Sequence, residues 1–174
     1  MGDVRINQGD MVRVYQSNPN EQTTYGITVV DNAKATLILD NINQKTKHPS
    51  EIASNEIAPS AIKVGNNADL TILVKGENKI NQVNAEVGPE VDAIGLGNAS
   101  TIKIKTFEET EGKLTLTQGT QESQELQGIQ GIEQKNVAYQ KALIGVNQPS
   151  GDKATATLNV DSGVIAATSK DNAP

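Results

Sequence analysis

The chain has 174 residues, a net charge of −6, a sequence pI near 4.8 and an aromatic content of only 2%. This length suits a single domain, and the acidity argues against nucleic acid or an anionic membrane as partner, because phosphate binding requires a basic face. The absence of cysteine excludes disulfides and thiolate metal sites. No apolar run reaches the roughly 18 residues that span a bilayer, so membrane insertion is not expected.

Residues 1–24 are expected to form N-terminal edge strands or a cap. Within them, apolar and polar residues alternate on both sides of a turn at Gly9, a pattern typical of two short strands. Residues 25–174 are expected to form the repetitive body of one elongated domain. The start at Met1 and Gly2 suggests a fragment of a larger protein that lacks its export signal.

The segments 27–43 and 62–78 repeat with a constant offset of 35. Their sequences, ITVVDNAKATLILDNIN and IKVGNNADLTILVKGEN, align without a gap, so that Asn43 falls on Asn78. A fixed offset shared by apolar, small and amide positions is the signature of stacked repeats, which bury their apolar faces against their neighbours. The two asparagines are expected to form an amide ladder at a bend, and residues 44–60 a loop insertion between the copies.

A third copy begins at Ala93. It places Ile94 on Ile62 with an offset of 32, but Ile104 on Val74 with an offset of 30. The corner between the two strands of this copy is therefore expected to be two residues shorter.

The fourth copy is the most displaced. It places Ile144 on Ile94 with an offset of 50, and Leu158 on Ile102 with an offset of 56. The aliphatic residues of all copies, Ile72 among them, alternate with polar ones and are expected to point into a common core.

The repeats predict an all-β fold in which equivalent strands of successive copies pair in parallel. Parallel pairing needs a long return path, and the remainder of each repeat supplies it. The expected object is a parallel β-helix with coils about 4.8 Å apart. A β-sandwich also has strands at regular spacing and is the competing fold, but it does not require a repeat of 35 residues.

The strings DNAKATLILDNIN, SAIKVGNNADLTILVKGEN, VDAIGLGNASTIKI and SGVIAAT resemble the repeats of right-handed parallel β-helix domains of bacterial secreted and cell-surface proteins, which are often described as carbohydrate-binding. The resemblance covers about residues 25–168. It implies a right-handed β-helix (solenoid) of about five coils with loop insertions, a pectate-lyase-like superfold, an extracellular or cell-surface location and contact with glycans. No binding residue is transferred by it, because the shared positions are structural.

Candidates for catalysis or metal binding are few, and none is proposed. His48 is the only histidine, so it cannot anchor an ordinary zinc site. The densest acidic run lies in a turn and is expected to be solvated (Glu108, Glu109 and Glu111). Calcium needs only oxygen ligands, and several aspartates lie near corners, but no D-x-D-x-D-G loop is present, so no cofactor is expected.

Candidate ligand-binding residues come from the exposed rings and the polar positions of loops and corners. Phe107 and Tyr139 lie in the least regular segments and are the best candidates for rings that stack on sugars. Lys47, Asn66 and Asn67 supply hydrogen-bonding groups in an insertion and at a corner. Function is sought in the parts that do not repeat, which are residues 44–60, 107–111 and 121–141.

The sequence therefore predicts a non-catalytic module of a bacterial surface or secreted protein, acting as a rigid scaffold with an adhesive or carbohydrate-binding face. The expected partner is a polysaccharide or a host or cell-surface glycan, and the expected state is a monomer or part of a longer chain. The alternative is a polysaccharide lyase or hydrolase on the same fold, with a lysine as base or with paired carboxylates.

Overall fold

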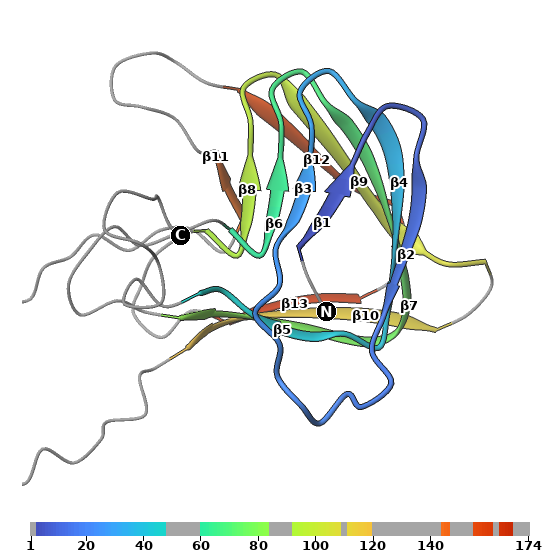
Figure 1. Cartoon of the computed structure of the whole chain (residues 1–174), viewed down its shortest axis with the longest axis vertical. Helices are drawn as coiled ribbons and strands as arrows, with labels where there is room; N and C mark the ends of the chain where they lie inside the picture. The colour runs from blue at the N-terminus through green and yellow to red at the C-terminus, as the bar shows by residue number, and fades with distance from the viewer. Residues whose placement is uncertain are drawn as a thin grey trace, which may run out of the picture.

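The computed structural model describes residues 3–47, 60–83, 92–108, 111–119, 144–146, 155–161 and 164–168, and these residues contain strands, turns and irregular segments but no helix (Figure 1). The strands in this part of the chain are β1 (Val4–Ile6), β2 (Met11–Tyr15), β3 (Ile27–Val29), β4 (Lys34–Asp40), β5 (Asn43–Lys45), β6 (Ile62–Val64), β7 (Asp69–Val83), β8 (Ile94–Leu96), β9 (Ser100–Thr106), β10 (Gly112–Gly119), β11 (Ile144–Val146), β12 (Ala156–Val160) and β13 (Val164–Thr168).

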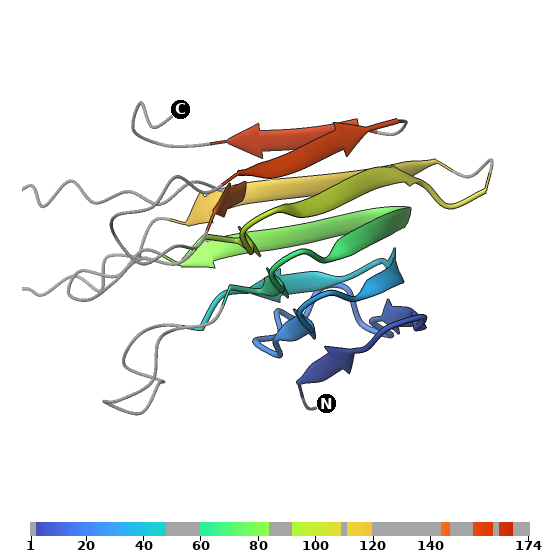
Figure 2. The same cartoon turned by 90° about the horizontal axis from the view of Figure 1, so that it is seen from above.

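The first sheet has five short parallel strands in the order β1-β3-β6-β8-β11. Its isoleucines follow one another in register: Ile27 pairs with Ile62, Ile62 with Ile94, and Ile94 with Ile144. The offsets of 35, 32 and 50 expected from the sequence are confirmed for this sheet. Figure 2 shows the strands following each other from the N-terminal to the C-terminal side of the molecule.

The second sheet has eight parallel strands and follows the order β12-β9-β7-β10-β13, with β4 and β5 also on β7 and β2 on β4. Its central strand is β7, which is 15 residues long and pairs with four other strands. The first half of β7 pairs with β4 and β9, and the second half with β5 and β10. The partners change near Gly76, whose φ of 66° is the left-handed conformation that glycine adopts at little cost.

These sheets correct the fold class expected from the sequence. The expectation was a right-handed parallel β-helix of about five coils. The described strands instead form two open parallel sheets of five and eight strands, with no closed sheet and no solenoid defined by their pairing. The physical reason lies in β7, which runs through the expected corner without a break, so that two expected faces belong to one sheet. The repeat spacing predicted which strands pair, but it carried no information on where one sheet ends and the next begins.

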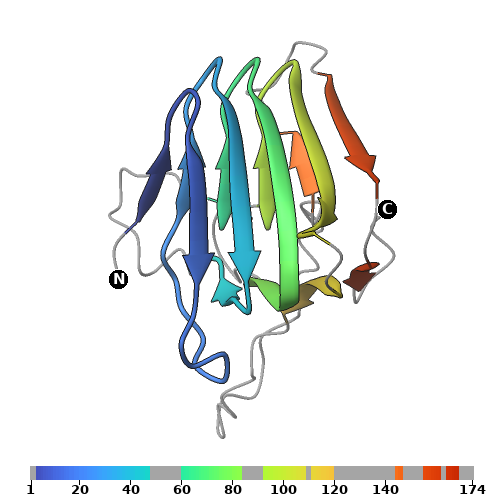
Figure 3. The ribbon, with the colours of Figure 1, turned by 90° about the vertical axis from the view of Figure 1, so that its right-hand side faces the viewer.

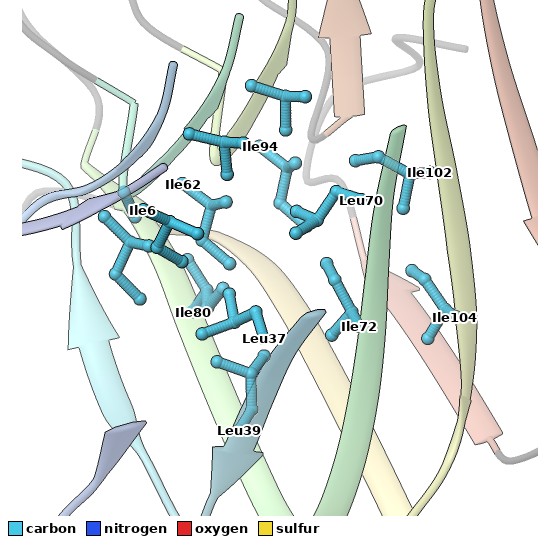
Figure 4. Packing of buried hydrophobic residues seen from close by; sticks show 14 of the residues in the cluster. Ile6, Leu37, Leu39, Ile62, Leu70, Ile72, Ile80, Ile94, Ile102 and Ile104 are labelled. Atoms are coloured by element: carbon cyan, nitrogen blue, oxygen red, sulfur yellow. The ribbon is translucent and has the colours of Figure 1, made fainter. Parts of the chain in front are cut away.

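An aliphatic core lies between the two sheets (Figure 4). Leu37 of β4 pairs with Ile72 of β7, which pairs with Ile104 of β9, and all three side chains are buried. The inward position expected for Ile72 is confirmed, since 0% of it is exposed. Burying one such side chain contributes roughly 1.5–3 kcal/mol, so the rows of the core are the main source of stability.

The register expected for the third copy is wrong by two residues. Ile104 pairs with Ile72 instead of Val74, so the offset of 32 continues through β9 and the corner is not shortened. A slip of two residues leaves every side chain on the same face of a strand, because side chains alternate with a period of two. The apolar pattern therefore could not distinguish an offset of 30 from one of 32.

The amide ladder expected from Asn43 and Asn78 is also absent. Asn43 pairs with Lys79, because β7 carries one more residue at this bend than the chain between β4 and β5. Asn78 is buried and satisfies the bend by itself: its Oδ1 accepts from Ile42 N at 3.1 Å, and its Nδ2 donates to Lys75 O at 3.0 Å. The expected loop at 44–60 likewise begins later than predicted, since β5 extends to residue 45.

Candidate functional site

The strands β2, β4, β7, β9 and β12 present a second face, opposite to the core. Along β4, Ala35, Leu37 and Leu39 belong to the core, so the residues between them point the other way. We call this side the outer face, and Figure 3 shows its strands side by side, from blue β2 to red-orange β12. Its residues, strand by strand, are Met11, Arg13 and Tyr15; Lys34, Thr36, Ile38 and Asp40; Asp69, Thr71, Leu73 and Lys75; Thr101, Lys103, Lys105 and Phe107; Thr157, Asn159 and Asp161.

Five of these residues form a continuous chain of contacts across four strands, here called the ring-to-ring row: Tyr15, Arg13, Asp40, Lys75 and Phe107. Arg13 donates to Asp40 Oδ2 from Nε at 2.9 Å and also from Nη2. Lys75 Nζ lies 3.7 Å from the same oxygen. Asp40 thereby links a cation of β2 to a cation of β7.

Asp40 is the buried centre of the row, since only 5% of it is exposed. Its second oxygen, Oδ1, accepts a hydrogen bond from Asn41 Nδ2 at 2.8 Å. A carboxylate with so little access to water needs such partners, and charge-assisted bonds are the strong ones. Both oxygens are occupied, so the side chain positions Arg13 and Lys75 on the outer face.

An aromatic ring stands at each end of the row, beside a cation. Arg13 Cζ lies 5.8 Å from the centre of the Tyr15 ring, and Lys75 Nζ lies 5.7 Å from the centre of the Phe107 ring. These separations are typical of cation–π contacts. Tyr15 is 59% exposed, whereas Phe107 is partly buried. The rings belong to β2 and to the residue after β9, three strand spacings or roughly 14 Å apart.

The structure places the sequence-predicted ligand residues in separate regions. Phe107 belongs to the ring-to-ring row. Lys47 lies near the N-terminus, with its Nζ 3.7 Å from Asp3 Oδ2. Asn66 and Asn67 lie in the turn before β7, whereas Lys75 lies near the middle of this strand. Tyr139 and His48 lie outside the described residues, as do residues 48–59, 109–110 and 121–141 of the segments in which function was expected.

Asn66 and Asn67 hold successive turns together. Asn66 N donates to Asp31 Oδ1 at 2.8 Å, and Asn66 Oδ1 accepts from Asn98 N at 2.8 Å. Asn67 has a φ of 54° and donates from Nδ2 to Asn32 Oδ1 at 3.4 Å. Asparagine tolerates this left-handed conformation better than most residues, which explains its repeated use here. The side-chain oxygen of Asn66 and the side-chain nitrogen of Asn67 are thus engaged within the turn stack.

Sequence reasoning missed Tyr15, Arg13, Asp40 and Lys75 as parts of a site. One signal was present: the offset of 35 between the first two copies already places Asp40 on Lys75. The register error hid a second signal, because an offset of 32 places Phe107 beside Lys75, whereas an offset of 30 moves it two residues along.

No group of three or more histidine, cysteine, aspartate or glutamate side chains in the described ranges is arranged to hold a metal ion. In the same part of the chain there is no helix with the length and hydrophobicity needed to cross a membrane. Comparison with protein families, curated proteins and solved structures finds no match to this chain.

Proposed function

We propose that the protein is a non-catalytic binding module whose outer face binds polysaccharide, with the ring-to-ring row as its centre. The observation that carries this proposal is the placement of Tyr15 and Phe107 at the two ends of one row, with polar and charged groups between them. Sugar rings stack on aromatic faces, and their hydroxyls bond to charged side chains. A flat sheet face offers both features to an extended chain.

The row is suited to binding and not to bond cleavage. A glycoside hydrolase needs two carboxyl groups flanking the scissile bond, with one of them free to act as base or nucleophile. Asp40 is the buried carboxylate of the row, and its oxygens are taken by Arg13, Lys75 and Asn41. The location proposed with this function is the extracellular space or the cell surface, where polysaccharides are accessible.

The test is affinity gel electrophoresis of the protein through gels that contain one neutral or acidic polysaccharide each. We expect retardation by at least one of them, and Tyr15→Ala and Phe107→Ala should each weaken it by roughly 3- to 10-fold, the range that one aromatic contact contributes. Leu158→Ala is the matched control, because Leu158 is 42% exposed but lies on the other face of its strand.

Retardation by none of the polysaccharides would overturn the proposal, as would binding that both ring variants leave unchanged. The same mixtures are then followed for unsaturated products by absorbance and for new reducing ends. Product formation that one lysine or carboxylate substitution abolishes would instead support a lyase or hydrolase.

A further inference from the structure

The outer face differs in charge from the chain as a whole. The chain carries a net charge of −6. On the outer face, cationic side chains outnumber anionic ones: Arg13, Lys34, Lys75, Lys103 and Lys105 stand against Asp40, Asp69 and Asp161. The face that carries the two rings therefore has an excess of positive charge, unlike the chain as a whole.

Two of these cations make no ion pair with the described residues, because both ion pairs of the outer face go to Asp40. Lys103 lies in register between Thr71 and Asn159, whereas Lys105 lies between Leu73 and Asp161 without forming an ion pair. Both lysines are exposed, and they stand two residues apart on β9, roughly 6.6 Å along the strand. They extend the positive charge from Lys75 toward β12.

Each ring of the row is also paired with a cation. A sugar that stacks on Tyr15 brings its substituents within reach of Arg13, and one that stacks on Phe107 meets Lys75. A ring beside a fixed cation favours sugars that carry a carboxylate or sulfate, because the cation gains a second anionic partner besides Asp40, which a neutral sugar cannot supply.

We infer that the ligand of the outer face is a linear acidic polysaccharide, whose anionic groups bind Arg13, Lys75, Lys103 and Lys105 while its sugar rings stack on Tyr15 and Phe107. This inference rests on the proposed function and specifies its substrate class. The chain of the ligand lies across the strands, since the row runs in that direction. A nucleic acid is also a polyanion, so net charge alone does not separate it from an acidic polysaccharide, and the comparison with single-stranded DNA tests it directly.

The experiment measures binding to polygalacturonate, to its fully methyl-esterified form, to dextran sulfate, to dextran and to a single-stranded DNA homopolymer, at low and at physiological salt. We expect binding to polygalacturonate or dextran sulfate, with at least tenfold weaker binding to the matched uncharged polymer. The stronger of the two anionic arms tells carboxylate from sulfate recognition. Binding should also weaken at the higher salt concentration.

Substitutions then locate the charge that the ligand meets. Lys103→Ala and Lys105→Ala should each weaken binding about two- to fivefold, as expected for exposed charge contacts. Lys63→Ala and Lys113→Ala remove the same charge from exposed positions on β6 and β10, and should leave binding unchanged. Thermal unfolding of all four variants checks that they keep their fold.

The outcomes separate this inference from the proposed function. Equal binding to charged and uncharged polymers that still depends on Tyr15 and Phe107 overturns the acidic ligand and leaves polysaccharide binding in place. Binding to no polysaccharide overturns both. Tighter binding to the DNA than to either acidic polysaccharide, or equal losses in the control lysine variants, also overturns the inference.

Discussion

The two faces of β4, β7 and β9 carry different kinds of side chain, although alternating residues of the same strands form both faces. On the inner face, Leu37, Ile72 and Ile104 stack in register as nearly equivalent aliphatic side chains. On the outer face, the next residues of these strands are Ile38, Leu73 and Lys105, so the residue type changes from one strand to the next. The inner face repeats because every layer must bury the same kind of surface against its neighbours.

The contrast between the two faces indicates where functional residues lie in a repetitive chain. The residues that repeat in the sequence are the aliphatic residues of the inner face, which stabilise the fold. The ring-to-ring row lies on the same strands, but its members differ from one layer to the next. Parallel pairing brings them together from positions far apart in the sequence, and so the strands that repeat also carry the site.

The largest expected effect comes from placing a charge on the inner face. Ile72→Asp should unfold the protein or lower its stability by several kcal/mol, because an unpaired carboxylate would be buried among aliphatic side chains. Thr71→Asp, the adjacent residue on the outer face, should change stability little. Urea denaturation followed by circular dichroism measures both. Equal effects in the two variants would contradict the assignment of the faces.

The next largest effect is expected in the turns that join the two sheets, such as the turn between β6 and β7. A Cβ at Gly65 would lie 2.5 Å from Asp31 N, so Gly65→Ala should cost roughly 1–3 kcal/mol through forced backbone movement. At Gly26 the nearest atom to such a Cβ is Asp3 Oδ1 at 3.6 Å, an ordinary contact. Gly26→Ala is therefore the control. Similar midpoints of unfolding for both variants would show that the turns are not packed against each other as described.

An effect of about the same size is expected from the buried polar group at the bend of β7. Asn78→Ala should cost about 1–3 kcal/mol, because Ile42 N loses its acceptor and Lys75 O loses one of its two donors in a buried bend. Asn43→Ala removes a more exposed contact to Pro19 O and should cost less. Chemical denaturation measures the free energy of unfolding of both variants. Equal losses of stability would support an amide ladder of Asn43 and Asn78, against the register described.

The smallest expected effect concerns the titration of Tyr25, whose side chain is buried in the core. Burial raises the pKa of Tyr25 above its usual value of 10.0, because the charged form is poorly solvated. The unfolded chain then loses this proton before the folded one, so stability is intact below pH 10 and falls as the pH rises toward the folded pKa. Tyr25→Phe should lose less stability than the parent protein between pH 9 and pH 11. A Tyr25→Phe curve parallel to that of the parent protein would contradict the assigned burial.

Much of the strand pairing was predictable from the apolar residues. Ile27, Ile62 and Ile94 were aligned correctly because side-chain alternation and constant spacing agree on one register. The fold class was predicted incorrectly, because it depends on whether a strand such as β7 bends within one sheet or ends at a corner. That choice lies in a local backbone feature near Gly76, and a repeat of aliphatic residues does not encode it.

Less of the candidate site was predictable. Phe107 was selected as an exposed ring. Predicting Lys75 as its neighbour would have required the exact register between β7 and β9. Arg13 could not be placed, because the N-terminal strands share no clear repeat with the copies that follow and their offset could not be read. The partners of a polar side chain on an outer face depend on the register, which the sequence left open by two residues.

In-register pairing assembles the outer face from residues distant in sequence, and disulfide cross-linking is a direct test of this pairing, since the chain has no cysteine of its own. Thr71 and Lys103 face each other on β7 and β9, and adjacent strands lie about 4.8 Å apart, within the reach of a disulfide. The double variant Thr71→Cys with Lys103→Cys should therefore oxidise readily to an intramolecular disulfide. Thr71→Cys with Thr101→Cys places the two Cα atoms roughly 8 Å apart and should not. Efficient cross-linking of the second pair, with none in the first, would contradict the register and with it the site.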